Sequence, residues 1–293
     1  MTDDTEVDKE DWEKVEYDLS ASRLKTHASC PKKYELKYIQ GLQPTKAASG
    51  YGELGSWVHL TIENVLQDYK GKVGQNALHA KLKQEFFRLG DTDEIDTGVI
   101  DDDQKGNALD NLEVAARYIT AQKPRIRALE KPVNFHIDNP NIDRTVYGKM
   151  DVVTKNGEIW DWKTGRVHPE FTPRDELIQG CVYMAGYHNE YGELPEAIKF
   201  AYIHPKAREK TDSDDDGPCE RQVDPTEESW QDMVQYARRL VQDEATGEYE
   251  AKPESGKCYF CDYELYCPAS QVGAGGINQI VAQEGGSAMW DAI

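Results

Sequence analysis

Three charged side chains lie close together in the stretch Val146–Arg166, which reads VYGKMDVVTKNGEIWDWKTGR. Asp151 belongs to a first run rich in β-branched residues, and Asp161 and Lys163 belong to a second run beyond the turn signal Asn156-Gly157. Two such runs predict a β-hairpin. Two carboxylates can hold a hard divalent cation, and a lysine beside them can orient a water and offset the charge of a phosphate. The hairpin therefore carries the groups for phosphodiester hydrolysis, although an ordinary exposed salt bridge on a surface hairpin would have the same sequence.

The register of this hairpin decides whether the two carboxylates can meet. With a two-residue loop, Asp151 would oppose Trp162, and the carboxylates would point to opposite sides of the sheet. With the three-residue loop Lys155–Gly157, Asp151 falls opposite Asp161 on one face. The glycine then takes the third, left-handed position, where its missing Cβ removes the steric cost. We predict the three-residue loop, or an equivalent bulge, with a positive φ at Gly157.

The local sequence GKMD followed by IWDWKTG resembles the PD-(D/E)xK nuclease superfamily. Within this superfamily, the local sequence is similar to that of the RecB-like branch, which includes the AddB nuclease domain and the CRISPR-associated exonucleases. Met150 stands where proline is usual, and the middle acid is Asp161, where glutamate is also common. The resemblance implies an α/β fold of the restriction-endonuclease type, in which a mixed β-sheet is flanked by helices.

Two predicted helices flank the hairpin in the order that this family shows. Gly52–Gln67 is a glycine-led amphipathic helix, in which His59 follows Gly55 by four residues. Pro173–Gly192 is a helix ended by glycine, and it carries Gln179 and Tyr183 one turn apart. From the residues alone, the histidine and the Gln–Tyr pair are ordinary helical side chains. In RecB-like nucleases, however, a Gly-x-x-x-His helix lends an imidazole to the catalytic metal, and a Gln-x-x-x-Tyr pair lies near the active site.

The resemblance therefore implies a complete set of site residues. Those implied for catalysis are Asp151, Asp161, Lys163, Gln179 and Tyr183, and those for Mg²⁺ or Mn²⁺ are His59, Asp151, Asp161 and the carbonyl of Trp162. Lys163 would position the attacking water, and the Gln–Tyr pair would orient this lysine or the nucleic-acid strand.

Three of the six cysteines lie within ten residues, in the sequence CYFCDYELYC, at Cys258, Cys261 and Cys267. Three thiolates this close favour a metal, and Cys30 is the candidate for a fourth ligand. Structural zinc usually takes its ligands from two local pairs, whereas an iron–sulfur cluster accepts one distant cysteine with a local triplet. We expect a cluster, with zinc and then free thiols as the alternatives. The pattern resembles the [4Fe–4S] staple of AddB and the CRISPR-associated exonucleases, which ties the two ends of the nuclease domain together.

The net charge is −20, with 54 acidic and 34 basic residues, which is the wrong sign for a surface that binds phosphates. A protein that never meets nucleic acid would have such a charge. A nuclease would need either a local basic groove or a salt-rich, halophilic cytoplasm that screens the repulsion. One basic cluster is present around Cys30–Tyr34, where lysines alternate with Tyr34 and Tyr38, a composition that suits base stacking but also an amphipathic helix.

The chain divides into three parts. Residues 1–17 are an acidic segment expected to be disordered, residues 18–270 are one nuclease-like domain with a helical subregion at 73–130, and residues 271–293 are a flexible tail rich in glycine. Within the domain, helices are expected at Leu109–Ala128 and a strand at Lys131–Asp138. No signal peptide or membrane-spanning run occurs, so a cytoplasmic protein without membrane partners is expected.

The predicted function is a divalent-metal-dependent DNA exonuclease that acts on single-stranded or frayed ends, in DNA repair and recombination or in CRISPR spacer processing. The alternative is a non-catalytic subunit that binds DNA ends within a nuclease–helicase or spacer-acquisition complex. No helicase P-loop occurs in the sequence, so a motor would be a separate protein partner.

Overall fold

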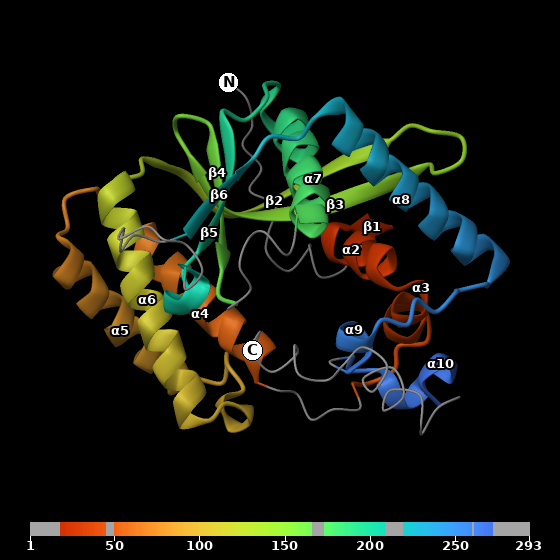
Figure 1. Cartoon of the computed structure of the whole chain (residues 1–293). Coiled ribbons are helices and arrows are strands. Elements are labelled where there is room, and N and C mark those ends of the chain that lie inside the picture. Colours follow the sequence, from red (N-terminus) through yellow and green to blue (C-terminus); the bar gives the residue numbers. More distant parts are fainter. Residues whose placement is uncertain (1–17, 45–49, 166–172, 209–218, 260, 272–293) are drawn as a thin grey trace.

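The computed structural model describes residues 18–44, 50–165, 173–208, 219–259 and 261–271 (Figure 1). The N-terminal segment 1–17 and the tail beyond residue 271, for which disorder and flexibility were predicted, lie outside the described residues. No helix in the described ranges is long and apolar enough to cross a membrane.

Strands and helices follow one another in groups along the chain, with helices α4–α6 before three consecutive strands, β2–β4. The strands are β1 (Leu19–Ser20), β2 (Ile126–Ile137), β3 (Arg144–Thr154), β4 (Glu158–Lys163), β5 (Ala197–Tyr202) and β6 (Cys219–Val223). The longer helices are α2 (Ala21–Ser29), α4 (Tyr51–Gln67), α5 (Gln75–Gly90), α6 (Asp102–Gln122), α7 (Pro173–Tyr191) and α8 (Glu227–Thr246). The short helical segments are α3 (Pro31–Tyr34), η1 (Glu35–Ile39), η2 (Thr97–Val99), η4 (Pro205–Arg208), α9 (Ser255–Tyr259), η5 (Glu264–Tyr266) and α10 (Pro268–Gln271).

The described strands form one six-stranded mixed sheet in the order β1-β3-β4-β5-β6, with β2 also paired to β3. The long strand β3 runs antiparallel to β2 over its whole length, so its other edge is shared by β1 and β4. β4 runs parallel to β5, and β6 closes the sheet antiparallel to β5. This arrangement confirms the predicted α/β fold with a mixed sheet.

Helices cover both faces of the sheet (Figure 1). On one face, α4, α5 and α6 pack against the side chains of Val152, Trp160 and Trp162. On the other face, α7 packs against β2, β3 and β5, and it is itself flanked by α2 and α8. Trp160 and Trp162 are almost fully buried, so they occupy the core face of β4.

The helix ends follow local rules of capping. The Ser20 hydroxyl accepts a hydrogen bond from the backbone N–H of Arg23, as expected for the cap of α2. Gly192 ends α7 with a φ of 74°, and its N–H donates to the carbonyl of His188. Cys181 inside α7 is fully buried and packs as a small apolar residue.

The predicted helix Leu109–Ala128 is wrong at its C-terminal end. Helix α6 stops at Gln122, because Lys123 adopts a left-handed φ of 47° and the next residue is Pro124, which lacks an N–H. The chain then enters β2 at Ile126 rather than at residue 131. The helical subregion placed at 73–130 accordingly ends before the first long strand.

The predicted register of the β3–β4 hairpin is confirmed. Val152 pairs with Trp160 and Val153 pairs with Ile159, so the same count places Asp151 opposite Asp161. The loop consists of residues 155–157, and Gly157 has a φ of 86°. Both predicted carboxylates therefore belong to adjacent positions of neighbouring strands.

Candidate active site

Three acidic residues lie in a row across three neighbouring strands. The pairs Leu129–Val152 and Lys131–Met150 of the β2–β3 ladder place Glu130 opposite Asp151. Asp161 of β4 continues the row on the other side of Asp151. Carboxylates at neighbouring positions repel one another, and here each of the three lies beside a basic side chain that offsets its charge, namely Lys149, His59 or Lys163.

Strands β3 and β4 separate at this row. Their ladder has only two paired positions, the last of which joins Val152 to Trp160. Beyond it, the backbone N–H of Trp162 donates to Oδ2 of Asp151 at 2.8 Å instead of to a backbone carbonyl. The side chain of Asp151 thus takes the place of a ladder partner, and it keeps a buried N–H satisfied where the strands part.

Asp161 is held by helix α7. Its Oδ1 accepts hydrogen bonds from Gln179 Nε2 at 2.7 Å and from Tyr183 Oη at 2.6 Å. The charge of Asp161 and, above all, burial raise the pKa of Tyr183 well above its usual range, so the phenol stays a hydrogen-bond donor. Two donors from one face of α7 therefore fix the orientation of this carboxylate.

The second oxygen of Asp161 faces the catalytic lysine of the predicted site. Lys163 Nζ lies 2.5 Å from Asp161 Oδ2, and it also donates to Gln179 Oε1 at 3.0 Å. Oδ2 of Asp161 is buried and has no well-directed hydrogen bond among the described residues. An inaccessible carboxylate oxygen with a spare lone pair is suited to a metal ion.

His59 of helix α4 lies beside Asp151. Its Nδ1 lies 3.3 Å from Asp151 Oδ2. Burial alone would lower the pKa of His59, but the charge and hydrogen bond of Asp151 outweigh burial and raise this pKa to about 9. A Cβ at Gly55, one turn before His59, would lie 3.4 Å from Oγ1 of Thr164, which is an ordinary van der Waals contact.

The closest cluster of possible metal ligands contains a residue that the sequence analysis missed. His59, Glu130 and Asp151 each offer a ligand atom, and these atoms lie within 4.8 Å of one another. Glu130 has a left-handed φ of 45°, which is strained for a residue with a side chain, and it forms an ion pair with Lys149. The cluster lines an open pocket of about 480 Å³ beside α4.

The structure thus relates the predicted residues in two groups. His59 and Asp151 lie in the pocket with Glu130, while Asp161 is joined to the catalytic candidates Lys163, Gln179 and Tyr183. The backbone N–H of Trp162, the residue after Asp161, donates to Asp151 and so connects the two groups. The role of the Trp162 carbonyl as a metal ligand stays a prediction. No local sequence pattern marks Glu130, because its position depends on how β2 pairs with β3.

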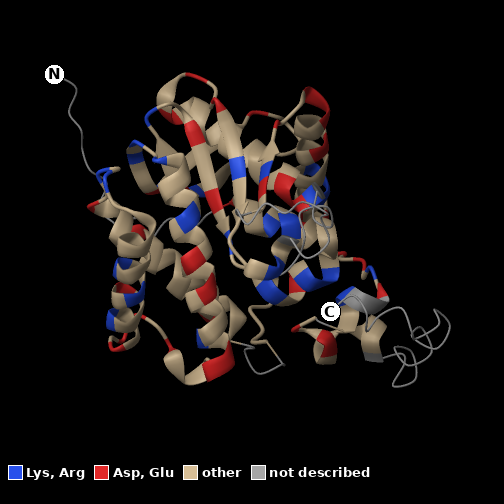
Figure 2. Ribbon diagram, turned by 60° about the vertical axis from the view of Figure 1, so that its left-hand side comes forward, with Lys and Arg blue, Asp and Glu red and all other residues tan. Residues whose placement is uncertain are grey.

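Only part of the basic and aromatic cluster near the N-terminus lies at the surface. Segment 21–39 holds five lysines and arginines against one acid, and Figure 2 shows basic bands gathered near the centre of the view, with acidic bands on most elements. Tyr34 is fully buried and donates a hydrogen bond to Glu244, so the idea that it stacks on bases is wrong. The aromatic face of this segment belongs to the core, whereas its lysines remain at the surface or at the active site.

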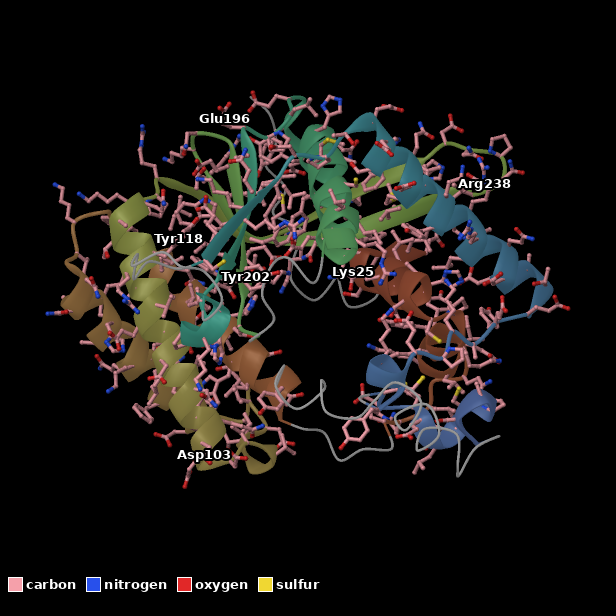
Figure 3. The ribbon with its side chains drawn as sticks, viewed as in Figure 1. Lys25, Asp103, Tyr118, Glu196, Tyr202 and Arg238 are labelled. Carbon is pink, nitrogen blue, oxygen red and sulfur yellow. The ribbon has the colours of Figure 1, made fainter. Side chains whose placement is uncertain are left out.

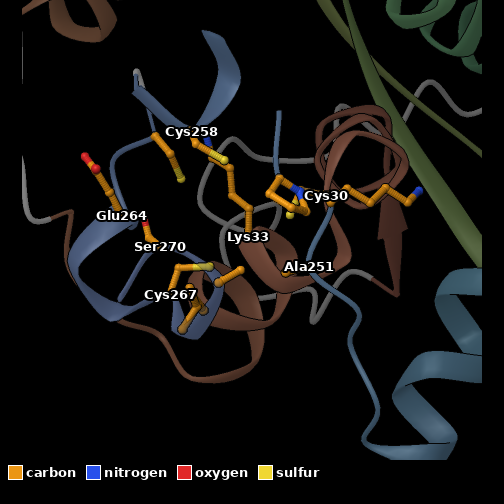
Figure 4. A pocket seen from close by; sticks show the side chains of 12 residues that line it. Cys30, Lys33, Ala251, Cys258, Glu264, Cys267 and Ser270 are labelled. Atoms are coloured by element: carbon orange, nitrogen blue, oxygen red, sulfur yellow. The ribbon is translucent and has the colours of Figure 1, made fainter. Parts of the chain in front are cut away.

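Four cysteines from the two ends of the domain line one hollow (Figure 4). They are Cys30, Cys258, Cys261 and Cys267. Cys30 lies between α2 and α3, and the other three belong to the segment around α9 and η5. An ion pair of 3.7 Å between Lys33 and Asp262 also joins these segments. The predicted one-plus-three set is therefore brought together in space, and none of the four residues forms a disulfide.

Two of the solved structures with similar folds overlap with most of this chain. One is the crystal structure of SSO0001, with a TM-score of 0.44, 14% identity, and coverage of 89% of this chain and 91% of that chain. The other is a protein from Eubacterium rectale named as a candidate exonuclease, with a TM-score of 0.48, 16% identity and 92% coverage of both chains.

A search of curated proteins finds no match. A protein-family model, described as the PD-(D/E)XK nuclease superfamily, matches residues 18–268, which include the whole sheet, the row of acids and the four cysteines. The chain belongs to the PD-(D/E)XK nuclease superfamily.

Proposed function

We propose that this protein is a divalent-metal-dependent DNA exonuclease of the RecB-like branch, which acts on single-stranded or frayed ends. The observation that carries the proposal is the row of Glu130, Asp151 and Asp161 across three strands, with Lys163 at the end of β4. Repair, recombination and CRISPR spacer processing are the settings in which such end-directed cleavage is used.

The donor set fits Mg²⁺ or Mn²⁺. Carboxylate oxygens and one imidazole are the ligands that these ions accept, and Asp161 Oδ2 is a buried oxygen that is ion-paired to Lys163 but has no well-directed hydrogen bond among the described residues. His59, Asp151 and Asp161 would hold the ion, with Glu130 as a further ligand. When bound, such a cation stabilises negative charge on a phosphodiester.

The remaining groups have distinct tasks in hydrolysis. The reaction joins a water oxygen to phosphorus and breaks one P–O ester bond, which leaves a phosphate monoester and a hydroxyl group. Lys163 has N–H donors to orient the water and to offset charge on the phosphate. Gln179 and Tyr183 keep Lys163 and Asp161 in place, because Gln179 bonds both and Tyr183 bonds the carboxylate.

We also propose a [4Fe–4S] cluster at the four cysteines. The arrangement of the cysteines favours the cluster over zinc, because structural zinc usually takes its ligands from two local pairs, whereas here one distant cysteine joins a local triplet at one hollow. The role of the cluster would be to join the two ends of the domain, because hydrolysis moves no electrons.

The test uses end-labelled linear single-stranded and double-stranded DNA, and circular single-stranded DNA of similar length. The purified protein is incubated with Mn²⁺, Mg²⁺ or EDTA, over a range of salt concentrations. We expect linear DNA to shorten from its ends with metal and to stay intact in EDTA, and circular single strands to survive. The matched control is Asp161→Asn, which keeps the volume of the side chain.

Two results would contradict the proposal. Cleavage of circular DNA at the rate of linear DNA would replace the exonuclease with an endonuclease. Binding of DNA ends without cleavage under every metal condition would favour the non-catalytic subunit of a larger complex.

A further inference from the structure

A second lysine reaches the catalytic amide from a different helix. Lys25 of α2 donates from Nζ to Gln179 Oε1 at 2.9 Å, and Lys163 donates to the same oxygen at 3.0 Å. The two ammonium nitrogens are therefore no more than about 6 Å apart. Figure 3 shows Lys25 where α2 meets the end of α7.

The two ammonium groups are not equally compensated. Lys163 has a carboxylate partner in Asp161, whereas no carboxylate oxygen of the described residues lies within ion-pair distance of Lys25. Lys25 is half-buried, and burial together with the charge of Lys163 lowers its pKa, against the weaker opposite effect of nearby acids. Two like charges close together with one direct counter-charge form a site that an anion would stabilise.

A phosphodiester has the right size for this site. Its two non-bridging oxygens are about 2.5 Å apart, so ammonium groups no more than about 6 Å apart can each donate to one of them with ordinary hydrogen-bond lengths. We propose that Lys25 is a second phosphate-binding lysine of the active site, which contacts a non-bridging oxygen of the phosphodiester to be cleaved. This assignment rests on the proposed nuclease function.

A purely structural role is the competing explanation. Lys25 also ties α2 to α7 through Gln179, so its removal could act only by loosening that amide. A structural role would not alter the number of phosphate charges that the protein neutralises. The dependence of DNA affinity on salt measures that number, and it therefore separates the two explanations.

The first experiment measures binding of a single-stranded oligonucleotide in EDTA, where cleavage is off, at several salt concentrations. Lys25→Met keeps the apolar stem and removes the charge, and Lys25→Ala is a second variant in case one of them folds poorly. We expect about tenfold weaker binding and a salt slope that is smaller by about 0.7, whereas Lys25→Arg keeps both near wild type. Lys83→Ala, at an exposed position of α5, is the control and should change neither.

The second experiment identifies the phosphate. A set of oligonucleotides carries one uncharged methylphosphonate, which is moved stepwise from the end past the cleavage position. In the wild type, neutralising the scissile phosphate should weaken binding about tenfold, and in Lys25→Met the same change should cost little, because the lysine that it would contact is gone. Thermal melting of each variant shows that folding is retained.

The outcomes separate this inference from the proposed function. A wild type that cleaves DNA with Mn²⁺, alongside Lys25 variants with unchanged salt slope and unchanged methylphosphonate profile, would overturn the role of Lys25 alone. Coupling to a different phosphate would also overturn it. A wild type that neither binds nor cleaves DNA would overturn both.

Discussion

The backbone N–H of Trp162 donates a 2.8 Å hydrogen bond to Oδ2 of Asp151, across the point where β3 and β4 part. This bond links the strand of the first carboxylate to the strand of the second, and it exists only in the register set by the three-residue loop. A slip by one residue would turn Asp161 toward the other face. The chemistry of the site thus depends on a turn that lies outside it.

The glycine of this turn should be sensitive to substitution. Gly157 has a φ of 86°, and its carbonyl accepts a hydrogen bond from Glu196, so Gly157→Ala would strain a backbone that other contacts hold in place. We expect a loss of about 1 kcal/mol in the free energy of unfolding, measured with denaturant.

The matched control for this turn is Gly106→Ala in helix α6. Nothing lies within 4 Å of a Cβ at Gly106, and alanine is the better helix former, so this variant should be more stable by up to about 1 kcal/mol. Equal stabilisation by both substitutions would show that the left-handed turn is not required.

The hydroxyl of Tyr183 should affect metal binding more than stability. Tyr183→Phe removes one of two hydrogen bonds to Asp161 Oδ1 and leaves the ring packed. Loss of such a supporting bond typically lowers metal affinity or activity by about 10- to 100-fold. The Mn²⁺ dependence of the cleavage rate gives this value directly.

Tyr187→Phe provides the comparison, because Tyr187 is also buried on α7 but its hydroxyl contacts Arg127 and Glu193, away from Asp161. The Mn²⁺ dependence should stay that of the wild type. If the two phenylalanine variants behave alike, the bond from Tyr183 does not position the carboxylate.

Glu130 should contribute to metal binding at a small cost to the metal-free protein. Glu130→Gln removes one of two opposed negative charges, so the metal-free protein should be as stable as the wild type or slightly more stable. Because a bound ligand stabilises the folded state according to its affinity, the rise in melting temperature with MnCl₂ should be smaller in this variant.

Glu190→Gln is the control for that measurement. Glu190 is also ion-paired to a lysine, Lys131, at 2.5 Å, but it lies outside the ligand cluster. Its response to MnCl₂ should equal that of the wild type, and an equal response of Glu130→Gln would remove Glu130 from the metal site.

Local patterns predict the parts of the site that belong to one element or to one hairpin. The three-residue turn follows from the need to place Asp151 and Asp161 on one face, and a left-handed glycine permits it. In the same way, Gln179 and Tyr183 are one helical turn apart, and both reach Asp161. Each of these relationships depends on residues near in sequence, whose geometry is fixed by strand or helix periodicity.

The parts that sequence reasoning missed depend on packing between distant elements. Glu130 enters the site through the β2–β3 register, and Lys25 enters it because α2 packs against α7. No local sequence pattern predicts that either residue lies in the site. Tyr34 shows the converse error: a basic and aromatic segment looked like a nucleic-acid surface, but its tyrosine faces the core beside Glu244. The periodicity of the sequence predicts an amphipathic helix, but it does not show which face of that helix packs against the rest of the domain.

The cysteine set should hold iron, and its loss should weaken the whole domain. Cys30→Ser removes the one ligand that is distant in sequence from Cys258, Cys261 and Cys267. In anaerobically purified protein we expect iron and acid-labile sulfide in the wild type, loss of both in the variant, and a lower melting temperature, because the link between α3 and the C-terminal segment is gone. Cys219→Ser, whose thiol lies outside the hollow, should retain the iron. Stoichiometric zinc without iron in the wild type would replace the cluster with a single-metal site.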